Sequence, residues 1–309
     1  MTSPTVQLAL AVGGPGLLSL ADAGTIAAAA EQAGIAAIRL ADRSPHGVAL
    51  DPTVTASYLA GRHGGVGWVP ELPTTGNAPY NAARRVLSLD RATGGRSGVA
   101  LRPGTGDEVS EQVVPEPGAT DPVRRWTEYA RVLARLWESF PRTAVIGDQR
   151  SGVVVDNSRI TPIRHEGAFY RVAGPLDGPS SAQGRPVLVA DLGLLDAGAV
   201  APLADVVVVD LAQAAGADAV LSQALRLAGR DRGEIALLGR VAVRRADAAG
   251  GLAGRLRRWA DEHLLDGIEL VPEGGAEDVV TVLQALTPRP PAPTLRAGYG
   301  LLERLVVPA

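Results

Sequence analysis

The sequence predicts an α/β fold of the (β/α)8 barrel class. Short apolar runs rich in β-branched residues, typical of strands buried on both faces, occur eight times along the 309 residues. A segment with helical periodicity or helix-capping residues follows each run. The main alternative, an open doubly wound sheet, would carry a glycine-rich phosphate loop after its first strand. Here Gly13-Gly14-Pro15-Gly16 places proline where free N–H groups are needed.

The eight expected strands follow one another along the chain. They span Val6–Val12, Ala36–Ala41, Val66–Leu72, Gly98–Leu101, Pro186–Ala190, Asp205–Leu211, Ile235–Val243 and Gly267–Val271. Helices are expected over Thr25–Ala33 with Asp22 as its cap, 51–60, Pro79–Leu89, Asp121–Ser139, 194–201, Ala217–Ala228, Leu252–Leu265 and Ala276–Leu286. In the helix Asp121–Ser139, large apolar residues recur three or four positions apart, which predicts a core-facing stripe. We expect residues 1–309 to form one barrel domain.

Two features depart from a regular barrel. An insertion at 140–184 precedes the fifth strand, and within it Val153–Val155 is expected to pair with Phe169–Val172 as a hairpin. The connection after the seventh strand is short, and a tail at 287–309 begins with the stiff run Pro288–Pro293.

Composition excludes several classes of function. The net charge of −3 is too small to indicate a nucleic acid or an anionic membrane as partner. The absence of cysteine excludes disulfides and thiolate chemistry. No apolar run is long enough to span a membrane, and no signal peptide is evident, so we expect a cytoplasmic protein. The four histidines lie far apart in the sequence, and no metal site is expected.

Several stretches resemble the bacterial luciferase-like flavin-dependent monooxygenases, in the nitrilotriacetate, EDTA and dibenzothiophene sulfone branch. Thr74–Gly98 is similar to that branch's STTxNEPYxxARxFASLDxxSGGRxGWNxVTS, and His165–Gly193 to HKGxxFxVRGPLNxPRxPQGxPVxxQAGxS. Asp266–Leu286 resembles DGFNLxPPxxPGGLDDFVxxVVPxL, and Thr294–Leu301 resembles TLRxxLGL. Ile38–Arg43, IRLADR, is similar to the second-strand motif FLAD. The similarity is collinear over most of the chain.

The resemblance implies an enzyme that oxygenates a small organic substrate with O2 and reduced FMN, which a separate flavin reductase supplies. It also implies a homo-oligomer, expected to be a dimer. Asp42 and, in the loop that follows it, His46 are the candidate catalytic residues. The positions that match flavin-contacting motifs, and are therefore expected to bind the cofactor, are Asp42, Thr74, Thr75, Asn77, Tyr80, Ala190 and Gly193.

Other positions differ from the family motifs. Val189–Gly193 stands where the family has QAGxS, so Asp191 lies where the flavin phosphate is expected. A carboxylate about 4 Å from a phosphate costs on the order of 1 to 4 kcal/mol. The short connection after the seventh strand retains only a Gly250-Gly251 turn, with Arg244 and Arg245 as substitute phosphate ligands. Two alternatives therefore stay open: a non-catalytic barrel that has lost flavin and serves as a partner subunit, and an oxidoreductase that uses the deazaflavin F420.

Overall fold

Eight parallel strands form a closed barrel in the computed structural model, which describes residues 4–106 and 113–303. In chain order they are β1 (Thr5–Leu10), β2 (Ala37–Leu40), β3 (Gly67–Pro73), β4 (Gly98–Arg102), β9 (Val187–Asp191), β10 (Val206–Asp210), β11 (Ala236–Val243) and β12 (Gly267–Pro272). The order around the barrel is β1-β12-β11-β10-β9-β4-β3-β2, so β1 pairs with β12 and closes it. The predicted fold class and all eight strands are confirmed.

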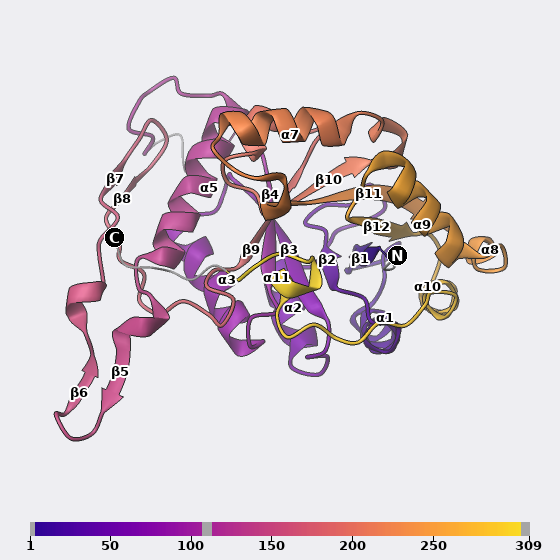
Figure 1. Ribbon diagram of the computed structural model, residues 1–309, viewed down its shortest axis with the longest axis horizontal. Helices are drawn as coiled ribbons and strands as arrows, with labels where there is room; N and C mark the ends of the chain where they lie inside the picture. The colour runs from indigo at the N-terminus through magenta and orange to yellow at the C-terminus, as the bar shows by residue number, and fades with distance from the viewer. Residues whose placement is uncertain (1–3, 107–112, 304–309) are drawn as a thin grey trace.

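Helices surround the barrel (Figure 1). They are α1 (Leu20–Ala33), α2 (Pro52–Ala60), α3 (Pro79–Ala92), α5 (Pro122–Glu138), α6 (Ala197–Val200), α7 (Ala217–Leu227), α8 (Arg245–Ala248), α9 (Leu252–His263), α10 (Ala276–Gln284) and α11 (Leu295–Gly298). The cap of α1 was predicted wrongly: Ser19 caps the helix, and Asp22 closes the capping box at the third position. No helix within the described residues is long and apolar enough to cross a bilayer.

Two apolar cores hold the barrel together. The larger lies between strands and helices, and it buries the predicted stripe of α5, including Trp126, Tyr129 and Trp137. The smaller fills the inside of the barrel near the amino ends of its strands, with Val69, Val189 and Leu238 among its members. Leu295, Tyr299 and Leu301, from α11 and the residues after it, complete this inner core. The C-terminal segment therefore plugs one end of the barrel, where Figure 1 shows α11 in yellow.

The insertion before β9 forms two small hairpins rather than the single hairpin that was predicted. β5 (Val145–Asp148) pairs with β6 (Val153–Val155), and β7 (His165–Glu166) pairs with β8 (Arg171–Val172). Each strand takes the nearest available partner, because the intervening turns are short and closing a short loop costs little entropy. The β5–β6 hairpin projects away from the barrel in Figure 1, and Val145, Ile146 and Val154 are exposed on it.

Candidate functional site

The carboxyl ends of the barrel strands meet at one open end, called here the mouth, which is where barrels of this class carry their active sites. Charged side chains fill the level just inside it. Five strands each contribute one: Arg39 of β2, Glu71 of β3, Asp191 of β9, Arg240 of β11 and Glu269 of β12. We call these five residues the ion-pair layer.

Arg39 is the centre of the layer. Its Nη1 and Nη2 donate to the two carboxylate oxygens of Asp191 at 2.9 and 2.6 Å, a bidentate contact. Its Nε donates to Glu71 Oε1 at 2.9 Å, and its Nη1 lies 3.6 Å from Glu269 Oε2. The Arg39 side chain is only 3% exposed and that of Glu269 is fully buried, so these charges depend on one another for neutralisation.

Arg240 joins the remaining members. Its Nε donates to Glu269 Oε1 at 2.6 Å and its Nη2 donates to Asp191 Oδ1 at 2.7 Å. Gln7 of β1 donates to Glu269 from below, and the Tyr299 hydroxyl in turn bonds the Gln7 amide oxygen. A continuous polar chain therefore runs from the C-terminal plug up to the mouth.

The layer perturbs the ionisation of its members. Burial by itself would raise the pKa of the Asp191 carboxyl, but Arg39 and then Arg240 outweigh it and hold that pKa at about 2. Burial would lower the pKa of Arg39, yet Glu269 and Asp191 raise it well above its ordinary value. Both groups are therefore charged at neutral pH.

Asp42 lies at the rim of the mouth, just after β2. Its backbone N–H donates to Glu71 Oε2 at 3.1 Å, and its carboxylate is 3.7 Å from Arg43 Nε. Burial, opposed by Arg43, raises the pKa of Asp42 above its ordinary value. His46 is exposed in the loop that follows. Together they place an acid and an imidazole on one side of the mouth.

The loop after β3, where Thr74, Thr75 and Asn77 were predicted to bind the cofactor, forms hydrogen bonds within the protein. Thr74 is fully buried, and its Oγ1 accepts from the Gly104 N–H at 3.0 Å. The Asn77 amide nitrogen donates to the Thr75 carbonyl at 3.2 Å, and its oxygen accepts from Arg85. Tyr170 of the insertion also donates to the Thr74 carbonyl, at 2.9 Å. These contacts make the loop rigid and occupy its polar groups.

The remaining predicted cofactor residues are dispersed. Tyr80 is half-buried and packs against the larger core between the strands and the helices, called here the outer core. The Ala190 side chain lies in that same core, between barrel and helices, so it does not face the mouth. Gly193 lies in the turn after β9 with φ of 148°.

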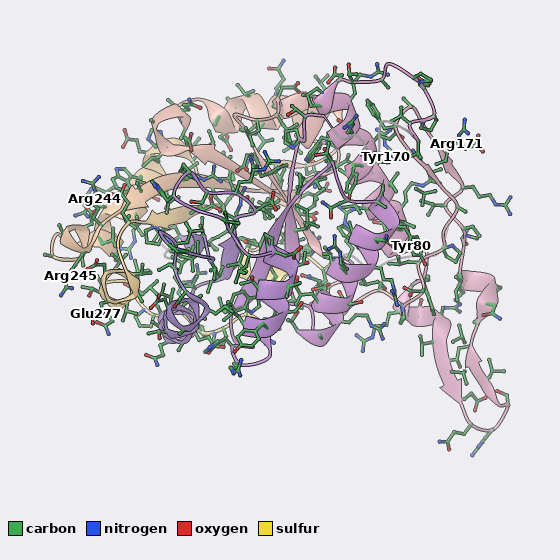
Figure 2. The ribbon with its side chains drawn as sticks, turned by 180° about the vertical axis from the view of Figure 1, so that it is seen from behind. Tyr80, Tyr170, Arg171, Arg244, Arg245 and Glu277 are labelled. Atoms are coloured by element: carbon green, nitrogen blue, oxygen red, sulfur yellow. The ribbon has the colours of Figure 1, made fainter. Side chains whose placement is uncertain are left out.

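Several acidic residues follow β11 and β12, on the side of the mouth where the resemblance leads us to expect a flavin phosphate. Asp247 lies in the first turn of α8, and Glu277 and Asp278 lie in the first turn of α10. The first turn of α9 carries no acid, and Asp218 of α7 pairs with Arg232 ahead of β11. Asp247 already accepts the Arg244 N–H at 2.8 Å, and Arg244 Nε donates to Glu273. Arg245 pairs with Asp278 at 3.2 Å. Figure 2 shows Arg244, Arg245 and Glu277 gathered at one end of the molecule.

An FMN group does not fit this set of residues. Its phosphate would need free N–H groups or unpaired cations, whereas Arg244 pairs with Glu273 and Arg245 pairs with Asp278. The predicted Gly250-Gly251 turn leads into α9, whose first turn carries no acid, so it is the one part of the predicted phosphate site that no carboxylate occupies among the described residues. The paired side chains of the ion-pair layer also close the interior of the barrel just below the mouth, so a ring could not enter it without breaking these pairs. Groups of three or more possible metal ligands are likewise missing from the described part of the chain.

Comparison with known proteins identifies the family. The family model described as luciferase-like monooxygenase matches residues 2–259. The chain belongs to the luciferase-like monooxygenase family. Several of its relatives are named as monooxygenases, which supports its assignment to an enzyme class.

Individual relatives give more detail. This luciferase-like chain is 31% identical to one of the subunits of pristinamycin IIA synthase from Streptomyces pristinaespiralis over 229 residues, 72% of this chain and 74% of the relative. It is 32% identical to nitrilotriacetate monooxygenase component A of Aminobacter aminovorans over 144 residues, 45% of this chain and 31% of that protein. The solved structure of EDTA monooxygenase from Chelativorans sp. BNC1 has the same fold, with a TM-score of 0.76, 19% identity, and coverage of 99% of this chain and 100% of that one.

Sequence reasoning singled out Asp191 but missed the four other members of the ion-pair layer. A signal for them was present, because AIRL, WVPELP, ALLGRVAV and GIELV each place one charge inside an otherwise buried strand. A charge at that position in a barrel strand has to find its partner on another strand.

Proposed function

We propose that this chain is a component of a two-component, FMNH2-dependent luciferase-like monooxygenase that oxygenates a small organic substrate with O2. A separate flavin reductase supplies the reduced FMN, and the assembly is a cytoplasmic dimer of luciferase-like barrels. The family match over residues 2–259 carries this proposal. One relative that matches over 72% of this chain is named as a subunit of a synthase, which supports a role for this chain as one component of a larger enzyme.

Within this assembly we propose that the chain works as one domain, 1–309, whose insertion at 140–184 borders the mouth. Asp42 and His46 are the groups that would face a substrate there, as proton donor and acceptor. Thr74, Thr75 and Asn77 would shape the rim, because their hydrogen bonds fix the loop after β3. Tyr80 and Ala190 would support it through the outer core, and Gly193 would shape the turn after β9.

Oxygen incorporation tests the proposal. The purified chain is combined with FMN, NADH, a flavin reductase and 18O2, alone and with each other luciferase-like protein of the same genome. The substrate panel includes nitrilotriacetate, dibenzothiophene sulfone and dimethyl sulfide, after which relatives are named. Transfer of one 18O atom that requires this chain supports the proposal. If no combination depends on the chain, the proposal is wrong.

A further inference from the structure

We infer that the ion-pair layer takes the place of a flavin in this barrel, so that the flavin of the assembly is held by a second luciferase-like barrel. The inference rests on the proposed function for the assembly as a whole, and it assigns this chain the role of the barrel without flavin. Three features of the chain support it.

The first feature is a coordinated set of substitutions. Matching Leu40-Ala41-Asp42 to the end of FLAD places Arg39 opposite phenylalanine. Asp191 lies opposite the uncharged stretch QAGxS, and matching Asp266–Leu270 to DGFNL places Glu269 opposite asparagine. Three positions that are uncharged in the motifs of the resemblance, on three different strands, are charged in this chain.

The second feature is that these three residues meet in space. Arg39 contacts Asp191 bidentately and lies 3.6 Å from Glu269, although 152 residues separate Arg39 from Asp191 in sequence. One new cation faces two new anions, and Arg240 supplies the balancing positive charge to both. Glu71 contacts Arg39 as well, and losing any one of the three would leave its buried partners with one counter-charge fewer, which is unfavourable. Their mutual pairing indicates that they form one structural unit.

The third feature is the burial of the layer. The side chains of Arg39 and Asp191 are 3% and 9% exposed, and the apolar inner core lies directly below them. A planar group that entered the barrel at this level would separate Arg39 from Asp191 and leave both charges buried without a partner at that contact. The acids in the first turns of α8 and α10 oppose a phosphate in addition, whereas the first turn of α9 carries none.

Flavin titration of the purified wild-type chain is the direct test. Calorimetry and fluorescence are recorded with FMN, anaerobically reduced FMN, riboflavin and F420, each up to 1 mM. We expect no saturable binding of any of the four. Saturable one-to-one binding of any of the four, with a Kd below about 1 mM, would show that the chain holds flavin and would overturn the inference.

A thermodynamic cycle tests the structural role of the layer. Arg39→Met and Asp191→Leu should each lower the Tm by roughly 10 °C, because each leaves buried partners with one counter-charge fewer. The double variant should recover part of that loss. The matched control is the exposed pair Arg84 and Asp177, 62% and 47% exposed, where Arg84→Met and Asp177→Leu should shift the Tm by less than about 2 °C. Equal, small shifts at both pairs would contradict a structural layer.

The two proposals fail separately. If the chain alone binds flavin while 18O transfer still requires it, the chain is a monooxygenase component but the inference is wrong. If it binds no flavin and no oxygenation ever depends on it, the proposed function is wrong.

Discussion

Single residues in this barrel carry charges that the rest of the fold has to neutralise. Asp191 is the clearest case, because two arginines from two other strands converge on its carboxylate. A buried ion pair of this kind adds little net stability compared with apolar packing, yet it becomes costly once one partner is lost. We therefore expect protonation of Asp191 to contribute to the loss of stability at low pH.

Acid titration should reveal this dependence. Because the folded-state pKa of Asp191, about 2, lies below the unfolded value of 3.8, its contribution is complete above about pH 4 and is lost as the pH falls toward 2. The expected loss is about 2 kcal/mol in the free energy of unfolding. Urea unfolding at pH 2, 3, 4 and 7 should show a shallower acid loss for Asp191→Asn. The exposed Asp177→Asn serves as the control, and an unchanged slope in Asp191→Asn would contradict the assignment.

Asp90, at the end of α3, should have the opposite effect on the pH dependence of stability. Burial raises its pKa to about 7, against hydrogen bonds from the Ser97 N–H and the Gln183 amide. A raised carboxyl pKa means that stability declines as the pH rises from about 4 to 7, since ionisation then opposes folding. Asp90→Asn should remove a decline on the order of 2 to 4 kcal/mol. If the free energy of unfolding falls equally with pH in the wild type and in Asp90→Asn, the role assigned to Asp90 is wrong.

At the scale of elements, the segment 294–301 has a role beyond that of a tail. Thr294 caps α11, and Leu295, Tyr299 and Leu301 enter the inner core. The barrel therefore has an apolar plug at one end and charged pairs at the other. This arrangement explains why the interior is filled along its whole length.

Leu295→Ala tests the plug. Leu295 is 2% exposed, so truncation should leave a cavity and cost about 2 to 5 kcal/mol. Leu302, which is 89% exposed seven residues later, offers a matched control whose substitution by alanine should change stability by less than about 0.5 kcal/mol. Chemical denaturation measures both variants, and equal effects would show that the segment does not support the core.

Sequence patterns predicted the elements well because each strand's signal is local. Val206–Asp210 and Val187–Asp191 are recognisable from five residues of buried, β-branched pattern. The pairing of β5 with β6 was missed because the turn that joins them has no strong signature, and several valine-rich partners compete. The ion-pair layer was missed for a different reason: its contacts join strands up to 152 residues apart, and a single sequence does not show which buried charges meet.

At the scale of the whole molecule, the β5–β6 hairpin stands apart from the barrel (Figure 1). Replacing residues 145–155 with a short Gly-Ser linker should leave the Tm of the barrel within a few degrees, because the hairpin's apolar residues are already exposed. By contrast, Tyr170→Ala, in the neighbouring hairpin, should lower the Tm, since Tyr170 is buried against Tyr129 and bonds the loop after β3. Differential scanning calorimetry distinguishes the two, and a large loss on linker replacement would contradict this division.

The closure of the barrel also constrains how the protein folds during synthesis. β1 has its partner β12 some 260 residues later in the chain, at Thr5 and Gly267, and the inner core is completed only by Leu301. While the ribosome is still translating the middle of the chain, β1 exposes an unpaired edge, and Arg39 has not yet met Asp191 or Glu269. The nascent chain therefore carries an open sheet edge and unmatched charges through most of its synthesis, and it completes its fold only near the end.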